Sequence, residues 1–374
     1  MRFTLSSTAL NNRLISLSKV INSKSSLQIL NCILFQVTGD KLTITASDNE
    51  NVMQSIIELE MAEGEGQFAI ASHTILDAMK DLAEQPVTFN VDLNMLTVTI
   101  SHQSGEYNFT AQNADGFPLP QKMGDNATTL TISSNVLADN ISRSLFATAQ
   151  EEIRPVMNGI YFDLTPDSLT IVATDGHKLV RSRNFNIKSE APASFILPKK
   201  PANLLKNTLE KNDSEVTIKF DSQAAEIEFE NGTLNCRLIE GRYPNYNSVI
   251  PTDNPNLITI DSKALMAALR HVLPFASESS QLVKLKVDAN ALELNSEDID
   301  FATSAKESIP CEFVGQPLMI GFKGSSLLEI LSNIGSDEIV IQLADPSRAG
   351  IIVPAIQPED QDILMLIMPM LLND

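Results

Sequence analysis

Asp175 and His177 are the residues whose types and spacing come nearest to acid–base chemistry. A carboxylate can orient an imidazole that acts as a general base, so Thr174-Asp175-Gly176-His177 allows a hydrolase hypothesis built on His177. The sequence supplies no nucleophile to match, because no Ser or Cys lies in a nucleophile-elbow context and Gly241-Arg242-Tyr243-Pro244 is not a phosphate-binding loop. No cluster of metal ligands accompanies the pair. We therefore expect a binding role at this segment, with no catalytic residue, no metal and no cofactor.

The tail of the chain is the second segment that could bind a partner. Residues 363–372 are almost entirely apolar, which is unusual because chain ends are normally solvated. We expect 363–367 to form a buried strand and the ladder to break at Pro369, which cannot donate a hydrogen bond. Met370 and Leu372 would then lie near the surface. Methionine adapts to varied apolar partners, so the tail is a candidate wall of a peptide-binding pocket.

The elements that must position these segments occur three times. Thr4-Leu5-Ser6-Ser7, Thr131-Ile132-Ser133-Ser134 and Thr259-Ile260-Asp261-Ser262 each predict a short strand, an N-cap and an amphipathic helix. In the first copy, Leu10, Leu14, Leu17 and Ile21 form the apolar stripe. Paired strands, a second helix and alternating strands follow in each third, and Phe117-Pro118, Tyr243-Pro244 and Met368-Pro369 close the thirds.

This repetition predicts an α+β fold of three homologous domains, at residues 1–127, 128–253 and 254–374. Each domain packs two helices on one face of a largely antiparallel sheet. Neighbouring domains can join edge to edge, because hydrogen-bonding their sheets removes exposed strand edges. A series of three still has two free ends, so it either stays open or closes with a second copy.

Several motifs are specific enough to indicate a family. They are Ala173-Thr174-Asp175-Gly176-His177-Lys178-Leu179, Glu240-Gly241-Arg242-Tyr243-Pro244-Asn245-Tyr246, Met368-Pro369-Met370, Arg154-Pro155-Val156-Met157-Asn158-Gly159 and Leu27-Gln28-Ile29-Leu30. Over the whole chain, they resemble the bacterial DNA sliding clamps, the beta subunits of DNA polymerase III. The resemblance implies a head-to-tail homodimer that closes six domains into a ring around duplex DNA. It also implies a non-catalytic processivity factor for DNA replication, which tethers the polymerase III alpha subunit, the clamp loader and other proteins with clamp-binding motifs.

The resemblance also implies a peptide-binding pocket in the middle domain and at its junction with the third. Its residues would be Met157, Thr174, Gly176, His177, Lys178, Leu179, Pro244, Ser248, Val249, Leu366, Ile367, Met368, Pro369, Met370 and Leu372. This chain departs from the family where arginine is frequent, at Ser248 and Leu371, and Asn373-Asp374 extend past the usual end. These departures bear on the pocket's electrostatics and leave its apolar floor intact.

The charge of the chain fits a ring better than a tight DNA-binding protein. The net charge is −20, divided as −7, −3 and −10 over the three thirds. Long-range electrostatics therefore repel polyanions, whereas a closed ring keeps DNA by topology and needs only weak, sequence-blind contacts. By resemblance, Lys24, Arg154, Lys199 and Lys200 would face DNA, with Lys19 and Lys206 as further candidates.

Ring closure would join the first domain of one chain to the third domain of the other, with Tyr107, Leu273 and Phe275 as candidate dimer-interface residues. The alternative to the clamp is an acidic peptide-binding hub that does not encircle DNA. Three separated cysteines cannot form a full disulfide framework, no apolar run approaches the roughly 20 residues of a membrane-spanning helix, and no signal-peptide core follows Arg2. A soluble cytoplasmic protein without a membrane partner is therefore expected.

Overall fold

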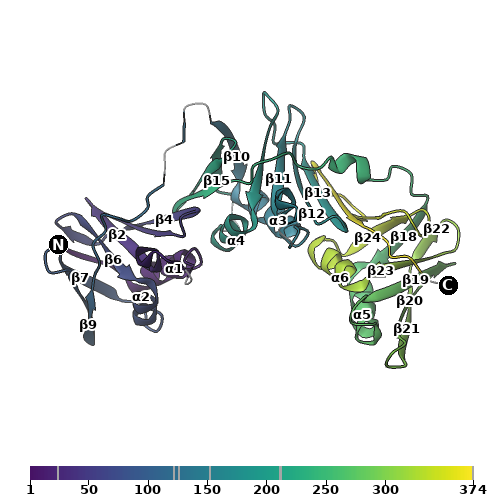
Figure 1. The fold of residues 1–374 in the computed structure, drawn as a ribbon, viewed down its shortest axis with the longest axis horizontal. Helices are drawn as coiled ribbons and strands as arrows, with labels where there is room; N and C mark the ends of the chain where they lie inside the picture. The colour runs from purple at the N-terminus through teal and green to yellow at the C-terminus, as the bar shows by residue number, and fades with distance from the viewer. Residues whose placement is uncertain (23–24, 121–122, 125–126, 151–152, 210–212, 373–374) are drawn as a thin grey trace. The chain divides into compact units, whose positions relative to one another are not determined.

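The computed structural model describes residues 1–22, 25–120, 123–124, 127–150, 153–209 and 213–372. It divides into two units, each with two sheets and covering helices (Figure 1). Unit 1 comprises Met1–Ala138 and Lys200–Leu238, and unit 2 comprises Asp139–Lys199 and Ile239–Asp374. The middle third of the sequence is therefore shared between the two units.

Unit 1 contains a five-stranded and an eight-stranded sheet. In spatial order the first sheet is β5 (Met61–Glu63), β1 (Arg2–Ser6), β7 (Pro86–Asp92), β8 (Thr97–His102) and β9 (Gly105–Thr110). The second is β10 (Thr128–Ser133), β15 (Glu215–Phe220), β16 (Ala224–Phe229), β17 (Gly232–Arg237), β4 (Asn51–Glu58), β3 (Lys41–Ser47), β2 (Cys32–Thr38) and β6 (Gly66–Ala71). Every described strand pair in them is antiparallel.

Unit 2 contains a nine-stranded and a four-stranded sheet. The first is β14 (Ala193–Pro198), β11 (Gly159–Leu164), β12 (Leu169–Thr174), β13 (Lys178–Asn184), β26 (Gln361–Ile367), β25 (Gly350–Pro354), β24 (Glu338–Leu343), β18 (Asn256–Asp261) and β22 (Glu312–Val314). The second is β21 (Thr303–Pro310), β20 (Ala291–Asp298), β19 (Leu282–Asp288) and β23 (Leu318–Lys323).

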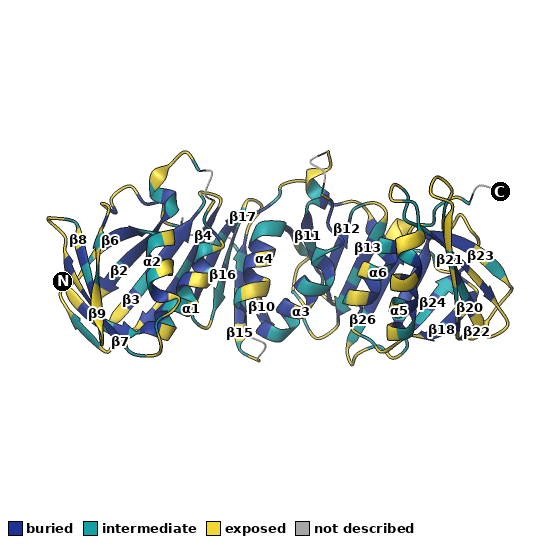
Figure 2. Ribbon diagram, turned by 90° about the horizontal axis from the view of Figure 1, so that it is seen from below, coloured by how far each residue is buried: buried dark blue, intermediate teal, exposed yellow. Residues whose placement is uncertain are grey.

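Six α-helices are described: α1 (Ser7–Ser18), α2 (Ser72–Met79), α3 (Ser134–Leu145), α4 (Lys199–Thr208), α5 (Ser262–Val272) and α6 (Gly324–Asn333). The predicted N-caps are confirmed, since the side chains of Ser6, Ser133 and Asp261 accept hydrogen bonds from backbone N–H groups three residues on. In each unit, the exposed residues of the helices lie on the side away from the strands, and the buried residues of the helices pack on the strands (Figure 2). α1 ends at Ser18, so Ile21 of the predicted stripe lies beyond the helix and is half-buried.

The helices and sheets enclose aromatic and aliphatic cores. In the first third, Phe3 and Phe89 stack with ring centroids 4.7 Å apart, and Phe35 and Phe68 with centroids 5.3 Å apart. All four rings are fully buried. Stacked aromatic pairs of this kind add stabilisation beyond their buried area, and these two pairs join the two sheets of unit 1 through a common core.

The expected edge-to-edge joining of neighbouring domains is confirmed inside each unit. In unit 1, β4 of the first third pairs with β17 of the middle third. In unit 2, β13 of the middle third pairs with β26 of the last third. Each joint turns two short sheets into one long sheet, so two strand edges are removed at each.

Candidate functional site

A cavity of about 720 Å³ lies in unit 2, and its wall is mainly apolar. Its lining comes from four separate stretches of chain: Ile153, Arg154, Pro155, Val156, Met157, Thr174, Gly176, Lys178, Leu179, Pro244, Asn245, Tyr246, Val249, Leu366 and Met368. A concave apolar cavity with a few polar groups at its margin is the usual form of a binding site for small molecules or side chains.

The pairing of β13 with β26 builds the floor of this cavity. Leu179 lies opposite Leu366, and both pack in a buried cluster with Tyr243 and Tyr246. Successive side chains of a strand point to opposite faces, so Ile367 instead joins the core of the last third. Met368 returns to the cavity side and keeps 40% of its surface exposed.

A closed turn between β12 and β13 forms one rim of the cavity. The Asp175 carboxylate accepts hydrogen bonds from the backbone N–H groups of His177 and Lys178 at 2.8 and 2.9 Å, and the Thr174 hydroxyl donates to the Lys178 carbonyl at 2.8 Å. Gly176 has a φ of +92°, a backbone conformation that residues with a side chain rarely adopt. The turn therefore presents a fixed backbone surface to the cavity.

Lys178 ties this turn to α6. Its Nζ lies 2.9 Å from Asp175 Oδ2 and 3.1 Å from Glu329 Oε2. Burial opposes the charged forms, but these ion pairs outweigh it and raise the pKa of Lys178; the hydrogen bonds from Lys178 and the turn likewise lower the pKa of Asp175 against its burial. The Asp175 carboxylate thus serves the turn and Lys178, while His177 stands exposed beside it.

Nine of the predicted pocket residues line the cavity, and six do not: His177, Ser248, Ile367, Pro369, Met370 and Leu372. The Ser248 hydroxyl donates to the Asn245 carbonyl at 2.7 Å. Past the strand, the tail turns to β23, where the Met370 N–H donates to the Gly321 carbonyl at 2.8 Å and Leu372 packs beside Gly321. The absence of a side chain on Gly321 makes room for the tail there.

Sequence reasoning missed six lining residues as part of the pocket: Ile153, Arg154, Pro155, Val156, Asn245 and Tyr246. Four of them directly precede Met157, and the short 3-10 helix Pro155–Met157 carries this segment onto the cavity. The motifs Arg154-Pro155-Val156-Met157 and Pro244-Asn245-Tyr246 already held five of them next to predicted pocket residues, and only Ile153, which is 80% exposed, lies outside those motifs.

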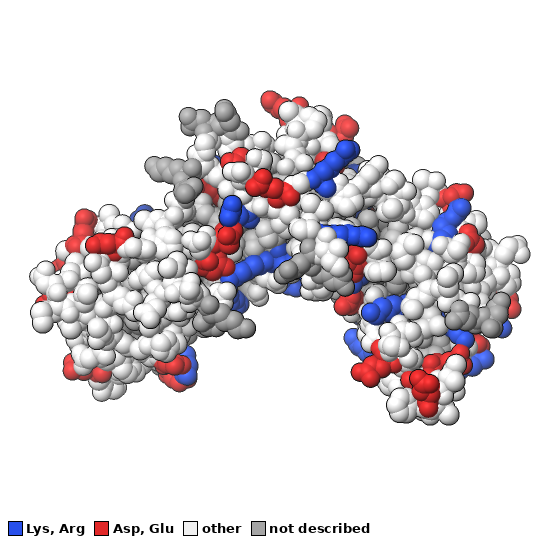
Figure 3. All heavy atoms as spheres, in the orientation of Figure 1, with Lys and Arg blue, Asp and Glu red and all other residues white. Residues whose placement is uncertain are grey.

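The residues expected to face DNA have varied surroundings. Lys24 lies outside the described residues. Arg154 lines the cavity, and the Lys199 ammonium donates to the Ala149 carbonyl, with burial lowering the pKa of Lys199. Lys200 pairs with Asp48 at 2.5 Å. In Figure 3, basic and acidic side chains are interspersed on the face shown.

β9 in unit 1 and β21 in unit 2 are outer strands of their sheets and pair on one side only among the described residues, as do β5, β10, β14 and β22. β9 is the last strand of its repeat, as β17 and β26 are of theirs. β21 occupies the position in its repeat that β4 and β13 occupy in theirs. Tyr107 lies on β9, with its ring centroid 5.0 Å from that of His102. Leu273 and Phe275 lie in the 3-10 helix after α5, where Leu273 is half-buried and Phe275 is 40% exposed.

The turns that precede β4, β13 and β21 are built in the same way. The carboxylates of Asp48, Asp175 and Asp298 each accept hydrogen bonds from the backbone N–H groups two and three residues on. In unit 1 this turn contacts α4 through Lys200, and in unit 2 it contacts α6 through Lys178. The third copy has no such helix contact among the described residues.

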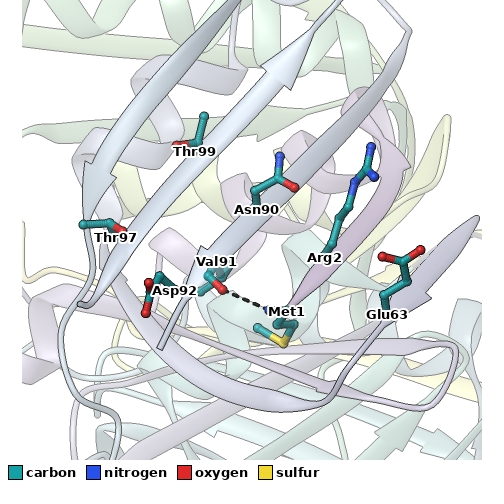
Figure 4. Close-up of a pocket in the computed structure, with 8 residues that line it drawn as sticks. All are labelled: Met1, Arg2, Glu63, Asn90, Val91, Asp92, Thr97 and Thr99. Carbon is teal, nitrogen blue, oxygen red and sulfur yellow. Dashed lines mark hydrogen bonds between the residues drawn. The ribbon is translucent and has the colours of Figure 1, made fainter. Parts of the chain in front are cut away.

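Figure 4 shows a second hollow, of about 460 Å³, in unit 1. The N-terminal ammonium of Met1 donates to the Val91 carbonyl at 3.0 Å, and Arg2 stands opposite Glu63 across β1 and β5. Charges of both signs line this hollow, so it lacks the apolar character of the cavity in unit 2.

Within the described ranges, no helix is long and apolar enough to cross a membrane, and no group of three His, Cys, Asp or Glu could hold a metal ion.

Comparison with known proteins accounts for the threefold repeat. Family models of the DNA polymerase III beta subunit match in order: the N-terminal domain at residues 1–121, the central domain at 131–245 and the C-terminal domain at 247–371. The beta sliding clamp of Pseudomonas aeruginosa is 26% identical over 99% of this chain and 100% of the relative, and that of Chlamydia muridarum is 25% identical over the full length of both.

Solved structures agree. A sliding clamp from Pseudomonas aeruginosa, bound to griselimycin, has a TM-score of 0.93 and 25% identity, with both chains covered in full. The Bacillus subtilis clamp has the same fold, with a TM-score of 0.91 at 23% identity over both full chains. With three clamp domains in order and relatives matched from end to end, the chain belongs to the bacterial DNA polymerase III beta subunit family, the non-catalytic DNA sliding clamps of replication.

Proposed function

We propose that two copies of this chain close head to tail into a ring around duplex DNA in the cytoplasm, and that the apolar cavity of unit 2 holds linear peptide segments of its partners. The partners are the DNA polymerase III alpha subunit, the clamp loader and other proteins with clamp-binding motifs. The observation that carries the peptide site is the 720 Å³ apolar cavity between the Thr174–Lys178 turn and Met368.

The free edges of β9 and β21 support the dimer. Both internal joints pair the strand equivalent to β21 with the strand equivalent to β9, so the same pairing between copies leaves neither edge free. The turn before β21 also exposes Ile299 and Phe301, at 86% and 80% of their surfaces. Apolar side chains this exposed are suited to burial against a second copy.

Light scattering tests the dimer. Wild-type protein should give twice the chain mass of 40.9 kDa at micromolar concentration. Phe275→Asp should shift the protein toward the monomer, because a carboxylate at an apolar interface is costly to desolvate. Ile356→Asp is the matched control, since Ile356 is 85% exposed in unit 2 and lies outside both β21 and the 3-10 helix Leu273–Phe275. A wild-type monomer would contradict the ring.

Retention on DNA tests the topological mode. Loaded protein should remain on circular duplex DNA and leave after that circle is cut, because a ring is held by topology rather than by phosphate contacts. Equal retention on circular and cut DNA would refute encirclement. The acidic hub that does not encircle DNA predicts no retention on either form.

Substitution of Met368 tests the peptide site. Met368→Ala removes apolar surface from the cavity and should weaken binding of a partner peptide by about 5- to 30-fold, on the basis of about 1–2 kcal/mol of lost burial. Leu371→Ala is the control, because Leu371 is 81% exposed and does not line the cavity. Equal affinity of the two variants would place the peptide elsewhere.

A further inference from the structure

A polar cavity of about 400 Å³ borders the apolar one in unit 2. The two cavities share Pro244, Asn245 and Tyr246 as a common wall. A peptide anchored in the apolar cavity therefore needs to pass only this wall to place a neighbouring side chain in the polar cavity.

The base of the polar cavity is aromatic and held in place. The rings of Tyr161 and Tyr243 stack with centroids 4.6 Å apart and an interplanar angle of 3°. The Tyr246 hydroxyl donates to Asp163 Oδ2 at 2.9 Å. This hydrogen bond occupies one oxygen of Asp163, the only carboxylate among the described lining residues, which weakens Asp163 as a partner for an incoming cation.

Arg242 is the one cation among the described residues that line this cavity, and it is uncommitted. Its side chain is exposed, and in the described part of the chain it makes no ion pair or hydrogen bond. The amide of Asn245 adds a neutral donor beside it. A guanidinium recognises a carboxylate through a planar fork of N–H donors, whereas it repels lysine and arginine.

We propose that this polar cavity is a second subsite for the bound peptide and that Arg242 reads a carboxylate next to the apolar anchor. The inference rests on the proposed peptide-binding function and adds to it the chemistry of the flanking residue. The carboxylate can come from an acidic side chain or from the end of the peptide chain. Partners that carry aspartate or glutamate beside their apolar anchor then bind better than those with neutral or basic residues, even though the protein as a whole is acidic.

Fluorescence anisotropy with the full-length protein tests this subsite. The probes are fluorescein-labelled, amidated peptides with adjacent leucine and phenylalanine in a serine-rich host, and with Asp, Asn or Lys directly before or directly after that pair. At one placement, the Asp peptide should bind about three- to tenfold more tightly than the Asn peptide, as expected for one partly exposed charge-assisted contact. The Lys peptide should bind most weakly, and added salt should reduce the differences.

Variants assign the effect to the guanidinium. Arg242→Ala should abolish the preference for Asp while still binding the Asn peptide, and Arg242→Glu should favour the Lys peptide. Arg270→Ala is the matched control, because Arg270 is an exposed arginine of the same unit outside both cavities. A further peptide that ends after the anchor, with a free or an amidated terminus, separates a chain-end carboxylate from an acidic side chain.

The outcomes separate this inference from the function on which it rests. Equal binding of Asp and Asn peptides at both placements, together with equal binding of the free and amidated ends, would overturn the subsite and leave the apolar site standing. Survival of the preference in Arg242→Ala, or preference of the wild type for Lys, would also overturn it. Failure of every peptide to bind wild-type protein would instead refute the peptide-binding function itself.

Discussion

Gly232→Ala should weaken the joint between the first and middle thirds. Gly232 begins β17, opposite Ser55 of β4. A Cβ atom at this position would lie 2.0 Å from the Gln54 carbonyl oxygen and 3.1 Å from its carbonyl carbon. Ordinary contacts begin at 3.4 Å, so the two strands must separate by 1.4 Å or distort. The obstruction is backbone, which cannot rotate away as a side chain can.

The cost follows from the hydrogen bonds at this end of the joint. The Ser55 hydroxyl donates to the Asn231 carbonyl at 3.0 Å, and the Ile56 N–H donates to the same oxygen at 3.1 Å. Each bond contributes a net stabilisation of about 1 kcal/mol, and strain adds to their loss. Alanine also lowers the conformational entropy of the unfolded chain, which offsets less than about 1 kcal/mol of this loss of stability. We expect the free energy of unfolding of unit 1 to fall by about 2–3 kcal/mol.

Hydrogen exchange measures this effect where it arises. The amides of β4 and β17 should lose protection in Gly232→Ala, and urea unfolding followed by circular dichroism should show the lower stability. Gly116→Ala is the control, because nothing lies within 4 Å of a Cβ atom built there; its stability should stay within about 0.5 kcal/mol of wild type. If the two variants exchange and unfold alike, the joint does not depend on the close approach at Gly232.

Three further outcomes follow from ionisable groups. A double-mutant cycle with Asp48→Asn and Lys200→Met should give a coupling of about 0.5–1.5 kcal/mol in urea unfolding, because the pair is only partly exposed; no coupling would mean that Lys200 is free for another role. Because the pKa of Lys178 is raised, its charged form stabilises the fold at pH values below 10.5, and this stabilisation is lost as the pH rises above that value. Because the pKa of Asp175 is lowered, its charged form stabilises the fold at pH values above 3.8, and this stabilisation is lost as the pH falls below that value. The contribution of this turn to unfolding should therefore be constant between those limits, and Asp175→Asn should remove the fall on the acid side. Burial, followed by the neighbouring carboxylate, raises the pKa of Tyr246 to about 12, so an ultraviolet titration should find a phenol that ionises there rather than near 10.

Much of the architecture could be predicted because it depends on local signals. The N-caps at Ser6 and Asp261 and the break of the last strand before Pro369 follow from side-chain and backbone chemistry within a few residues. The division of the middle third between two units could not be predicted, because it depends on β4–β17 and β13–β26 pairings between segments far apart in the chain.

The sequence also could not predict which face of the last strand each of its residues occupies. Residues 363–367 are apolar throughout because both faces of β26 are covered, by the core of the last third on one side and by the cavity cluster on the other. A strand buried on both faces has no alternation from which to assign Leu366 to the cavity and Ile367 to the core. The ion pair of Lys200 could not be predicted either, since its partner Asp48 lies 152 residues away in the sequence. Which of the predicted site residues act in binding stays a prediction.

The aromatic base of the polar cavity gives this protein a built-in optical reporter. The chain has four tyrosines and no tryptophan, and Tyr161, Tyr243 and Tyr246 all surround the proposed peptide site. Three of the four tyrosines are thus gathered where a ligand would arrive. A peptide carrying one tryptophan would be the sole indole in solution, and energy transferred to it from the protein's phenols would signal occupancy without any label.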